Sequence, residues 1–331
     1  MSLLAAKSFS QNGLGLMRMT SHDGPMPDEE AFAVLKAALA AGVNVWNGAD
    51  FYGTSEHNSL HLLARYFSKY PEDAEKVVIC IKSGIADFRN FLMDGSPEAV
   101  RRSVANANKI LGGHKKIDIF GIARVDPKIP IEDTVRALKE LVEKGEIGGI
   151  QLSEVGAATI RRAASVAKID MVEEEVSLWA TDIFDNGVAT TCAELGIPIV
   201  AHTPLGAGML TGQIKSIDDL PPGPYPRIFP RFQPENFHKN LDLVAEIEKL
   251  AKAKSVSPAQ LALSWLKLQS KKPGMPLIIP IAGARSEARV KENATTVDLS
   301  EEDLKTITAI LDSFPVAGDR YPAAAMKLVE F

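Results

Sequence analysis

The sequence predicts an α/β fold, namely a (β/α)8 TIM barrel with its active site at the C-terminal mouth of the strands. Short runs rich in β-branched residues alternate with longer helical patterns from Val43 almost to the end of the chain, as in βαβ units around a parallel sheet. The length of 331 residues is also usual for a barrel that forms one unit. We therefore expect a single barrel domain over residues 1–331.

Eight runs have the composition of buried strands, which is the number that closes such a barrel. They lie at 13–17, 43–49, 77–83, 117–123, 147–153, 171–178, 197–203 and 277–283. Helix signals separate them: Pro27 and three acidic residues begin a helix that stops at Gly42, and a Ser96-Pro cap begins another that ends at Gly112. Further helical patterns lie at 131–145, around 181–196, at 286–293 and at 300–311.

Two segments interrupt or follow this alternation. Residues 207–238 are rich in Pro and Gly, so we expect a long functional loop there. Residues 296–331 should form a C-terminal helix and a tail that folds back across the mouth.

A doubly wound sheet would fit the same alternation, but it needs a GxGxxG turn after the first strand. Gly13 and Gly15 begin that pattern, whereas Arg18 replaces the third glycine, and the barrel is therefore favoured.

The composition excludes several classes of function. A net charge of -5, with no cluster of basic residues, argues against nucleic-acid binding. The absence of a signal-peptide pattern and of any 18-residue apolar run predicts a cytoplasmic protein without a membrane partner. Cys80 and Cys192 each lie in an apolar segment and should be buried, inert thiols. No metal site is expected, because five histidines lack ligand spacing with acids or cysteines: His22, His57, His61, His114 and His238.

The end of the second expected strand, WNGADFYGTSEHNSL at 46–60, resembles the FIDTADxYGxxE segment of the aldo-keto reductases. The resemblance continues over nearly the whole chain, in family order and at strand ends. It includes KSG at 82–84, IDIFGIARVDP at 117–127, IQLSEV at 150–155, EEEVSLW at 173–179, TPLGAGMLTG at 203–212 and IPIAGARSEARVKEN at 279–293. It implies an NADP-dependent oxidoreductase that uses NADPH to reduce the carbonyl of a small-molecule aldehyde.

Transferred position by position, the resemblance implies that Tyr52 is the proton donor and that Lys82 lies beside it. When hydride reaches a carbonyl carbon, negative charge grows on the oxygen, and a positioned acid accelerates the reaction roughly 10²–10⁴-fold. A cation beside a phenol favours the tyrosinate and so makes the phenol a stronger acid. Lys82 would supply that cation.

Two positions depart from the family pattern. The family's aspartate beside the lysine is Asn47 here, and its histidine at the end of the fourth strand is Ala123. We expect the ammonium of Lys82 to be less compensated, because an amide carries no charge. We expect Ala123 to open space in the substrate pocket for a polar substituent. Strand alternation should turn Arg124 away from Ala123, toward a structural ion pair with Asp126 rather than toward a substrate.

The resemblance also implies a set of cofactor residues. Ser153 and Glu173 match positions that hold the nicotinamide carboxamide, and His202 either stacks on the nicotinamide ring or is a core histidine. Two arginines near the adenosine end favour NADPH over NADH, because arginine can clamp a 2′-phosphate with two hydrogen bonds. The other cofactor-binding positions are Gly15, Met17, Leu205, Gly206, Gly208, Gly283, Arg285, Arg289, Glu292 and Asn293.

Within the family, the patterns WNxxxFYG, ARVDPKxPIE and LSEV resemble the fungal pyridoxal reductases, also called pyridoxine 4-dehydrogenases. That resemblance implies reduction of pyridoxal to pyridoxine and a place in vitamin B6 metabolism. Two alternatives remain open. One is a reductase of another aryl aldehyde or of a natural-product carbonyl. The other is a catalytically weak regulatory subunit that binds NADPH.

Overall fold

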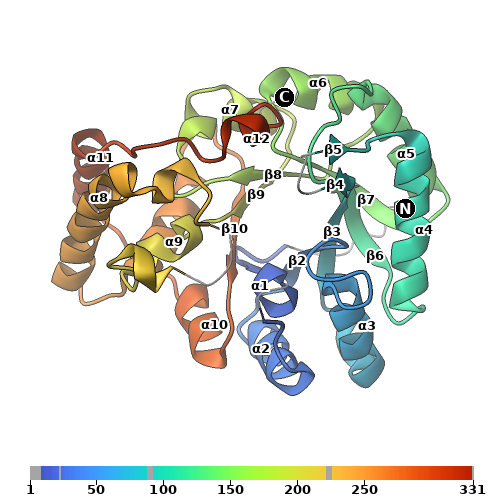
Figure 1. The fold of residues 1–331 in the computed structure, drawn as a ribbon, viewed down its shortest axis with the longest axis horizontal. Helices are drawn as coiled ribbons and strands as arrows, with labels where there is room; N and C mark the ends of the chain where they lie inside the picture. Colours follow the sequence, from blue (N-terminus) through green and yellow to red (C-terminus); the bar gives the residue numbers. More distant parts are fainter. Residues whose placement is uncertain (1–8, 22–23, 88–91, 221–225, 330–331) are drawn as a thin grey trace.

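The computed structural model describes residues 9–21, 24–87, 92–220 and 226–329. Eight parallel strands close into a barrel in the order β1-β10-β9-β8-β7-β6-β3-β2, with helices around the outside (Figure 1). The predicted fold class is therefore confirmed. The barrel strands are β1 (Gly13–Gly15), β2 (Val45–Ala49), β3 (Val78–Ser83), β6 (Ile117–Ile122), β7 (Ile147–Ser153), β8 (Met171–Glu175), β9 (Ile199–His202) and β10 (Ile278–Gly283).

Amphipathic helices surround the barrel, and their ends carry ordinary capping residues. In α4, the Ser96 side chain accepts a hydrogen bond from Ala99 N, and Gly112 closes the helix in a left-handed conformation. The helices of eight or more residues are α2 (Asp28–Ala40), α3 (Ser59–Lys69), α4 (Pro97–Leu111), α5 (Ile131–Glu143), α6 (Ala157–Val166), α8 (Pro234–Ala253), α9 (Pro258–Gln269), α10 (Glu287–Ala294) and α11 (Glu301–Ser313). Shorter helices are α1 (Met17–Thr20), α7 (Val188–Glu194) and α12 (Ala323–Met326).

The apolar core has two parts. A large cluster lies between the barrel and the helices, and a smaller one contains interior side chains of six strands, among them Val45, Cys80 and Met171. Both cysteines are free and buried, as predicted, and burial raises the pKa of the Cys192 thiol to about 12. Polar side chains at the C-terminal strand ends lie above the smaller cluster, so apolar side chains pack beneath them inside the barrel.

The segments that interrupt the alternation are more ordered than the sequence indicates. The expected loop 207–238 contains two 3-10 turns, η4 (Ile217–Asp219) and η5 (Pro230–Phe232). A third, η3 (Gly206–Thr211), overlaps the start of the loop, and α8 begins within it at Pro234. Residues 221–225 lie outside the described residues. A short hairpin of β4 (Ile85–Asp87) and β5 (Leu92–Met93) was not predicted. No helix in the described part of the chain is long and apolar enough to cross a membrane.

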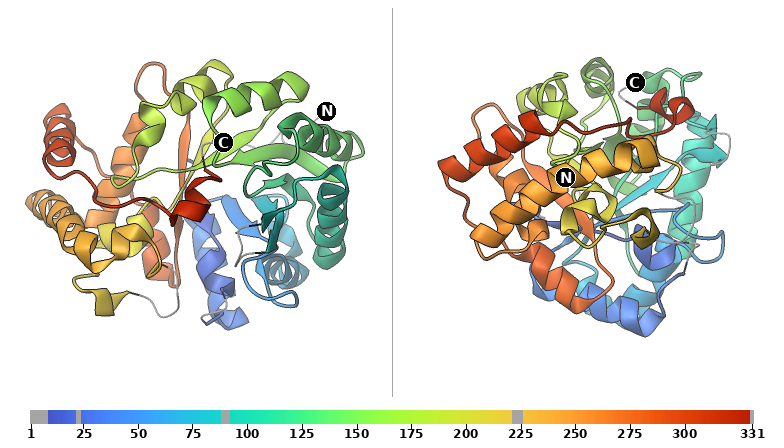
Figure 2. Two further views of the ribbon diagram at one scale, coloured as in Figure 1. Left: turned by 45° about the horizontal axis from the view of Figure 1, so that its top comes forward. Right: turned by 60° about the vertical axis from the view of Figure 1, so that its left-hand side comes forward.

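The C-terminal tail folds back over the strand ends, as expected. It runs from α11 along the barrel to α12 (Figures 1 and 2). Arg320 in this tail donates a hydrogen bond to the carboxylate of Glu154, just beyond β7, at 3.1 Å. Asn240 of α8 also holds the tail, because its side-chain amide donates to Ala317 O and its amide oxygen accepts from Ala317 N.

Candidate active site

A buried lysine stands at the centre of the site. Lys82 lies near the end of β3, is 2% exposed and points into the barrel. Its Nζ donates to Asn47 Oδ1 on β2 at 2.6 Å and to the two carboxylate oxygens of Glu173 on β8 at 2.7 and 2.8 Å. Strands β3 and β8 are separated by β6 and β7 in the sheet, so the Lys82–Glu173 contact crosses the barrel interior.

Asn47 completes the arrangement by bridging the two charged groups. Its Nδ2 donates to Glu173 Oε2 at 2.8 Å while its Oδ1 accepts from Lys82. This fixes the amide orientation, because an ammonium can only donate and an ionised carboxylate can only accept. Three strands therefore contribute one closed group of an amide, an ammonium and a carboxylate.

The expectation that the Lys82 charge is less compensated is wrong. The missing aspartate is replaced by Glu173, which approaches from the opposite side of the barrel. Burial acts to lower the pKa of Lys82, but the charge of Glu173 and further contacts hold it above the ordinary value. Burial acts to raise the pKa of Glu173, and the charge of Lys82 outweighs this and lowers it. The pair is therefore a charged one inside the barrel.

Tyr52 lies in the turn after β2, close to this group. The Lys82 Nζ is 5.4 Å from the centroid of the Tyr52 ring, and Phe51 packs against that ring edge to face. The turn is held by Asn58, whose side chain donates to Asp50 O at 2.8 Å and also accepts from the first N–H groups of α3. The structure thus brings together the three predicted catalytic residues Tyr52, Lys82 and Asn47.

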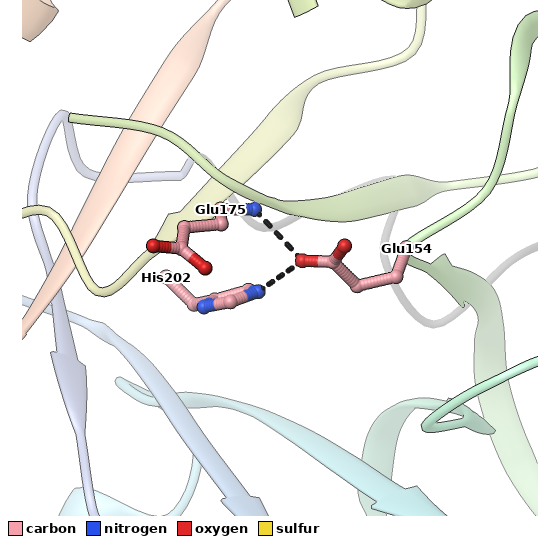
Figure 3. A group of neighbouring side chains, drawn as sticks. All are labelled: Glu154, Glu175 and His202. Atoms are coloured by element: carbon pink, nitrogen blue, oxygen red, sulfur yellow. Dashed lines mark hydrogen bonds and ion pairs between the residues drawn. The ribbon is translucent and has the colours of Figure 1, made fainter. Parts of the chain in front are cut away.

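A second charged group, formed by Glu154, Glu175 and His202, lies at the C-terminal strand ends (Figure 3). Glu154 is 0% exposed and has a left-handed backbone with φ of 53°. Its Oε1 contacts His202 Nε2 at 2.5 Å and accepts from Glu175 N at 3.1 Å (Figure 3). Burial acts to raise the pKa of Glu154, but His202 and two arginines hold it well below the ordinary value.

The same three residues, Glu154, Glu175 and His202, place possible metal-ligand atoms within 4.8 Å of one another. The chain supplies its own cation at this position. A guanidinium nitrogen of Arg320 lies 3.1 Å from Glu154 Oε2 and 3.9 Å from Glu175 Oε2. The negative charges of Glu154 and Glu175 are therefore paired with the guanidinium of Arg320.

Arg124 lies differently from the prediction. Its NH1 donates to Ala123 O at 2.6 Å, and its NH2 approaches the Tyr321 hydroxyl at 3.5 Å. Asp126 instead accepts from Gly95 N and Lys128 N, so the expected Arg124–Asp126 ion pair is wrong. The reason is that β6 ends at Ile122, so strand alternation no longer governs residue 124. Ala123 itself is 2% exposed, and the expected open space above it is therefore restricted.

The cofactor positions form an arc around the mouth. Gly15 on β1 pairs with Gly283 on β10, and the Arg285 guanidinium donates to Arg18 O and Gly24 O beside them. Arg289 pairs with Glu292 on α10, and Asn293 donates to Gly283 O at 3.4 Å. Met17 begins α1, directly after β1, and is half-buried. These residues belong to adjacent elements, as one binding surface requires.

On the other side of the arc, the strand ends have unusual backbone and unsatisfied polar atoms. Ser153 Oγ is buried without a hydrogen-bond partner among the described residues. Thr203, Gly206, Ala207 and Gly208 all have positive φ, in the loop that also holds Leu205. Strained backbone of this kind collects at functional sites. His202 is held by Glu154 and Thr203, and whether its ring stacks on a cofactor remains a prediction.

Sequence reasoning missed Glu154, Glu175 and Arg320 as residues of the mouth. A signal was present for the second, because three consecutive glutamates at 173–175 end a strand that is otherwise apolar. Burial of several acids on one strand requires cationic partners. Nothing in the sequence pattern indicated that Arg320, far along the chain in the tail, is one of them.

Comparisons with known proteins identify the family and the fold. A model described as the aldo/keto reductase family matches residues 13–312. A probable pyridoxal reductase of Schizosaccharomyces pombe is 40% identical over 316 residues, covering 93% of each chain. A putative pyridoxal reductase of Saccharomyces cerevisiae is 36% identical over 337 residues, covering 94% of this chain and 96% of its own. A solved glycerol dehydrogenase of Gluconobacter oxydans shares the fold, with a TM-score of 0.81, 24% identity and coverage of 97% and 98%. The chain therefore belongs to the aldo/keto reductase family.

Proposed function

We propose that this aldo/keto reductase is an NADPH-dependent carbonyl reductase that converts pyridoxal to pyridoxine, with Tyr52 as the proton donor. The observation that carries the proposal is the position of Tyr52 at the barrel mouth, with the buried ammonium of Lys82 5.4 Å from its ring. In a barrel of this kind the C-terminal strand ends form the active site. No other tyrosine–lysine pair among the described residues lies at these strand ends.

The residues at the mouth fit a nicotinamide cofactor. Aldo-keto reductases generally use NADP(H), and the bound cofactor supplies the hydride that reaches the carbonyl carbon. The unpartnered hydroxyl of Ser153 is suited to hydrogen-bond a carboxamide, since it can both donate and accept. Arg285 is exposed and Arg289 half-buried beside the glycine pair of β1 and β10, where their guanidinium groups can bind a 2′-phosphate. The serine supports a nicotinamide cofactor, and the two arginines support NADPH over NADH.

On the substrate side, Tyr52 gives its proton to the carbonyl oxygen as negative charge develops there. Lys82 stays charged because Glu173 offsets its burial, and it stabilises the tyrosinate that is left. The names of the two fungal relatives support pyridoxal as the substrate. Pyridoxal also carries an acidic hydroxyl beside its 4-aldehyde, and Arg124 offers a cation near Tyr52 that could meet it.

The proposal is tested by mixing the protein with pyridoxal and NADPH, or NADH, and following the nicotinamide absorbance. We expect turnover with NADPH, and we expect Tyr52→Phe to reduce it at least ~10²-fold, because only the acid is lost. Fluorescence titration should show that the variant still binds NADPH nearly as well. If Tyr52→Phe retains turnover, the proton donor is another residue.

The two alternatives give different results in the same assay. A reductase of another aryl aldehyde would oxidise NADPH with a panel of aldehydes and leave pyridoxal untouched. A regulatory subunit would bind NADPH and turn over none of them. The presence of both Tyr52 and Lys82 in contact range favours an enzyme over the regulatory subunit.

A further inference from the structure

We propose that Glu173 is the positioning carboxylate of the catalytic lysine, a task that aldo-keto reductases give to an aspartate where this chain has Asn47. The carboxylate beside the lysine is thus on β8 instead of β2. This inference deepens the proposed function, since it concerns the same lysine and the same proton donor. It also gives Glu173 a different task from the cofactor contact that its position in the sequence implies.

The first support is the hydrogen bonding around Lys82. Both Glu173 oxygens lie within 2.8 Å of Nζ, and Asn47 Oδ1 lies at 2.6 Å. Glu173 Oε2 also accepts from Asn47 Nδ2 at 2.8 Å. The side-chain hydrogen bonds of Glu173 thus go to the lysine and the amide, and Glu173 and Asn47 together fix the position of Nζ.

The second support is the electrostatic requirement of the buried site. Lys82 and Glu173 are each 2% exposed, and a buried charge is costly unless it is paired. Glu173 is the one carboxylate within ion-pair distance of Lys82 among the residues that the structure describes. An amide at position 47 and an amide at position 173 together would leave the ammonium unpaired. One of the two positions must carry the acid.

The test exchanges these groups again. Glu173→Gln removes the carboxylate, and the double variant Asn47→Asp with Glu173→Gln returns it to β2. Glu174→Gln is the matched control, because it makes the same chemical change at the next residue of the strand. Glu174 is equally buried, but its carboxyl accepts from Val155 N and does not contact Lys82.

Two measurements separate positioning from simple damage. In protein without cofactor, NMR of isotope-labelled lysine follows the titration of the Lys82 ammonium. In protein with NADPH and aldehyde, kcat is measured as a function of pH. Glu173 acts to raise the pKa of Lys82, so its loss should let the ammonium deprotonate at lower pH. The alkaline limb of kcat should then move to lower pH.

We expect Glu173→Gln to lower kcat at neutral pH roughly 10–100-fold, by analogy with the loss seen when the hydrogen-bond partner of a metal ligand is removed. The double variant should recover most of kcat and return both the Lys82 titration and the alkaline limb toward the original values. Glu174→Gln should leave the Lys82 titration and the pH dependence of kcat unchanged.

The inference would be overturned if Lys82 titrates in Glu173→Gln at the same pH as in the original protein. It would also be overturned if the double variant folds but the alkaline limb of its kcat stays at the lower pH. If Glu173→Gln does not fold, the double variant decides, since it carries the acid again. Failure of the proposed function is distinct: the original protein would then oxidise no NADPH with pyridoxal, although the cofactor-free titrations of Lys82 could still be read.

Discussion

Arg124 is a cation at the barrel mouth whose hydrogen-bond partners are neutral. They are Ala123 O and the Tyr321 hydroxyl, and no carboxylate of the described residues lies within ion-pair distance. Burial acts to lower the pKa of Arg124, but the charges of Glu154, Tyr321 and Tyr52 raise it, so the guanidinium stays charged near the proton donor. With five N–H donors, it has capacity left for an acidic oxygen on a substrate.

We therefore expect Arg124→Met to affect substrates unequally. For pyridoxal or 2-hydroxybenzaldehyde, kcat/KM should fall about 10–100-fold, since a hydrogen bond to a charged group contributes about 1.5–3 kcal/mol. For benzaldehyde, which lacks the neighbouring hydroxyl, kcat/KM should change little. The control is Arg162→Met, an exposed arginine paired with Glu132 outside the mouth. Equal losses for all three aldehydes would show that Arg124 acts on folding or on the cofactor instead.

At the scale of an element, the turn after β2 depends on one glycine. Gly53 has φ of 123°, and a Cβ built there would lie 2.2 Å from His57 O and 2.6 Å from Thr20 O. The residue directly before it is Tyr52. The turn can keep the phenol in place only while both backbone oxygens can approach position 53.

Gly53→Ala should therefore displace Tyr52 and destabilise the protein. The cost should exceed the roughly 1–3 kcal/mol of a strained backbone, because the methyl group also collides with two carbonyl groups. Gly24→Ala is a matched control: its φ is 125°, but nothing lies within 4 Å of the added carbon. We expect Gly53→Ala to lower both Tm and kcat more than Gly24→Ala. Equal losses of Tm and kcat in the two variants would show that the backbone angle, and not the collision with the two carbonyl groups, causes the destabilisation.

Much of this organisation could be predicted from the sequence because it is local. Strand periodicity placed all eight strands, and Tyr52 and Lys82 follow from patterns at strand ends. The Lys82–Glu173 pair could not be predicted in this way, since it joins strands that are not neighbours in the sheet. The position of Arg124 was missed because β6 ends at Ile122, one residue before the end of the expected strand at 117–123.

At the scale of the molecule, two neighbouring glutamates of β8, Glu173 and Glu174, have pKa values shifted in opposite directions. Glu173 faces the interior and its pKa is lowered, whereas Glu174 lies toward Cys192 of α7. Burial, and then the charge of Glu154, raise the pKa of Glu174 well above the ordinary value. The folded protein therefore keeps a proton on Glu174 that the unfolded chain releases.

This difference predicts how stability depends on pH. For a carboxyl with a raised folded pKa, its contribution is complete below the unfolded pKa of about 4.3 and is lost as pH rises toward the folded value. Glu174→Gln should remove that loss, because an amide does not ionise. Urea unfolding should show the variant gaining stability relative to the original protein between pH 5 and pH 8. A constant difference between the two proteins over this range would contradict a protonated Glu174.

The contact of Arg320 with Glu154 has a consequence for synthesis of the chain. Strand β1 pairs with β10, and the mouth is then covered by a tail whose anchoring arginine lies near the C-terminus. A chain emerging from the ribosome presents β1 as an unpaired sheet edge until β10 has been made. Such edges favour association with other chains, so the nascent protein is exposed to aggregation until β10 pairs with β1. Arg320 follows β10 in the chain, so Glu154 gains this partner only after β10 has been made.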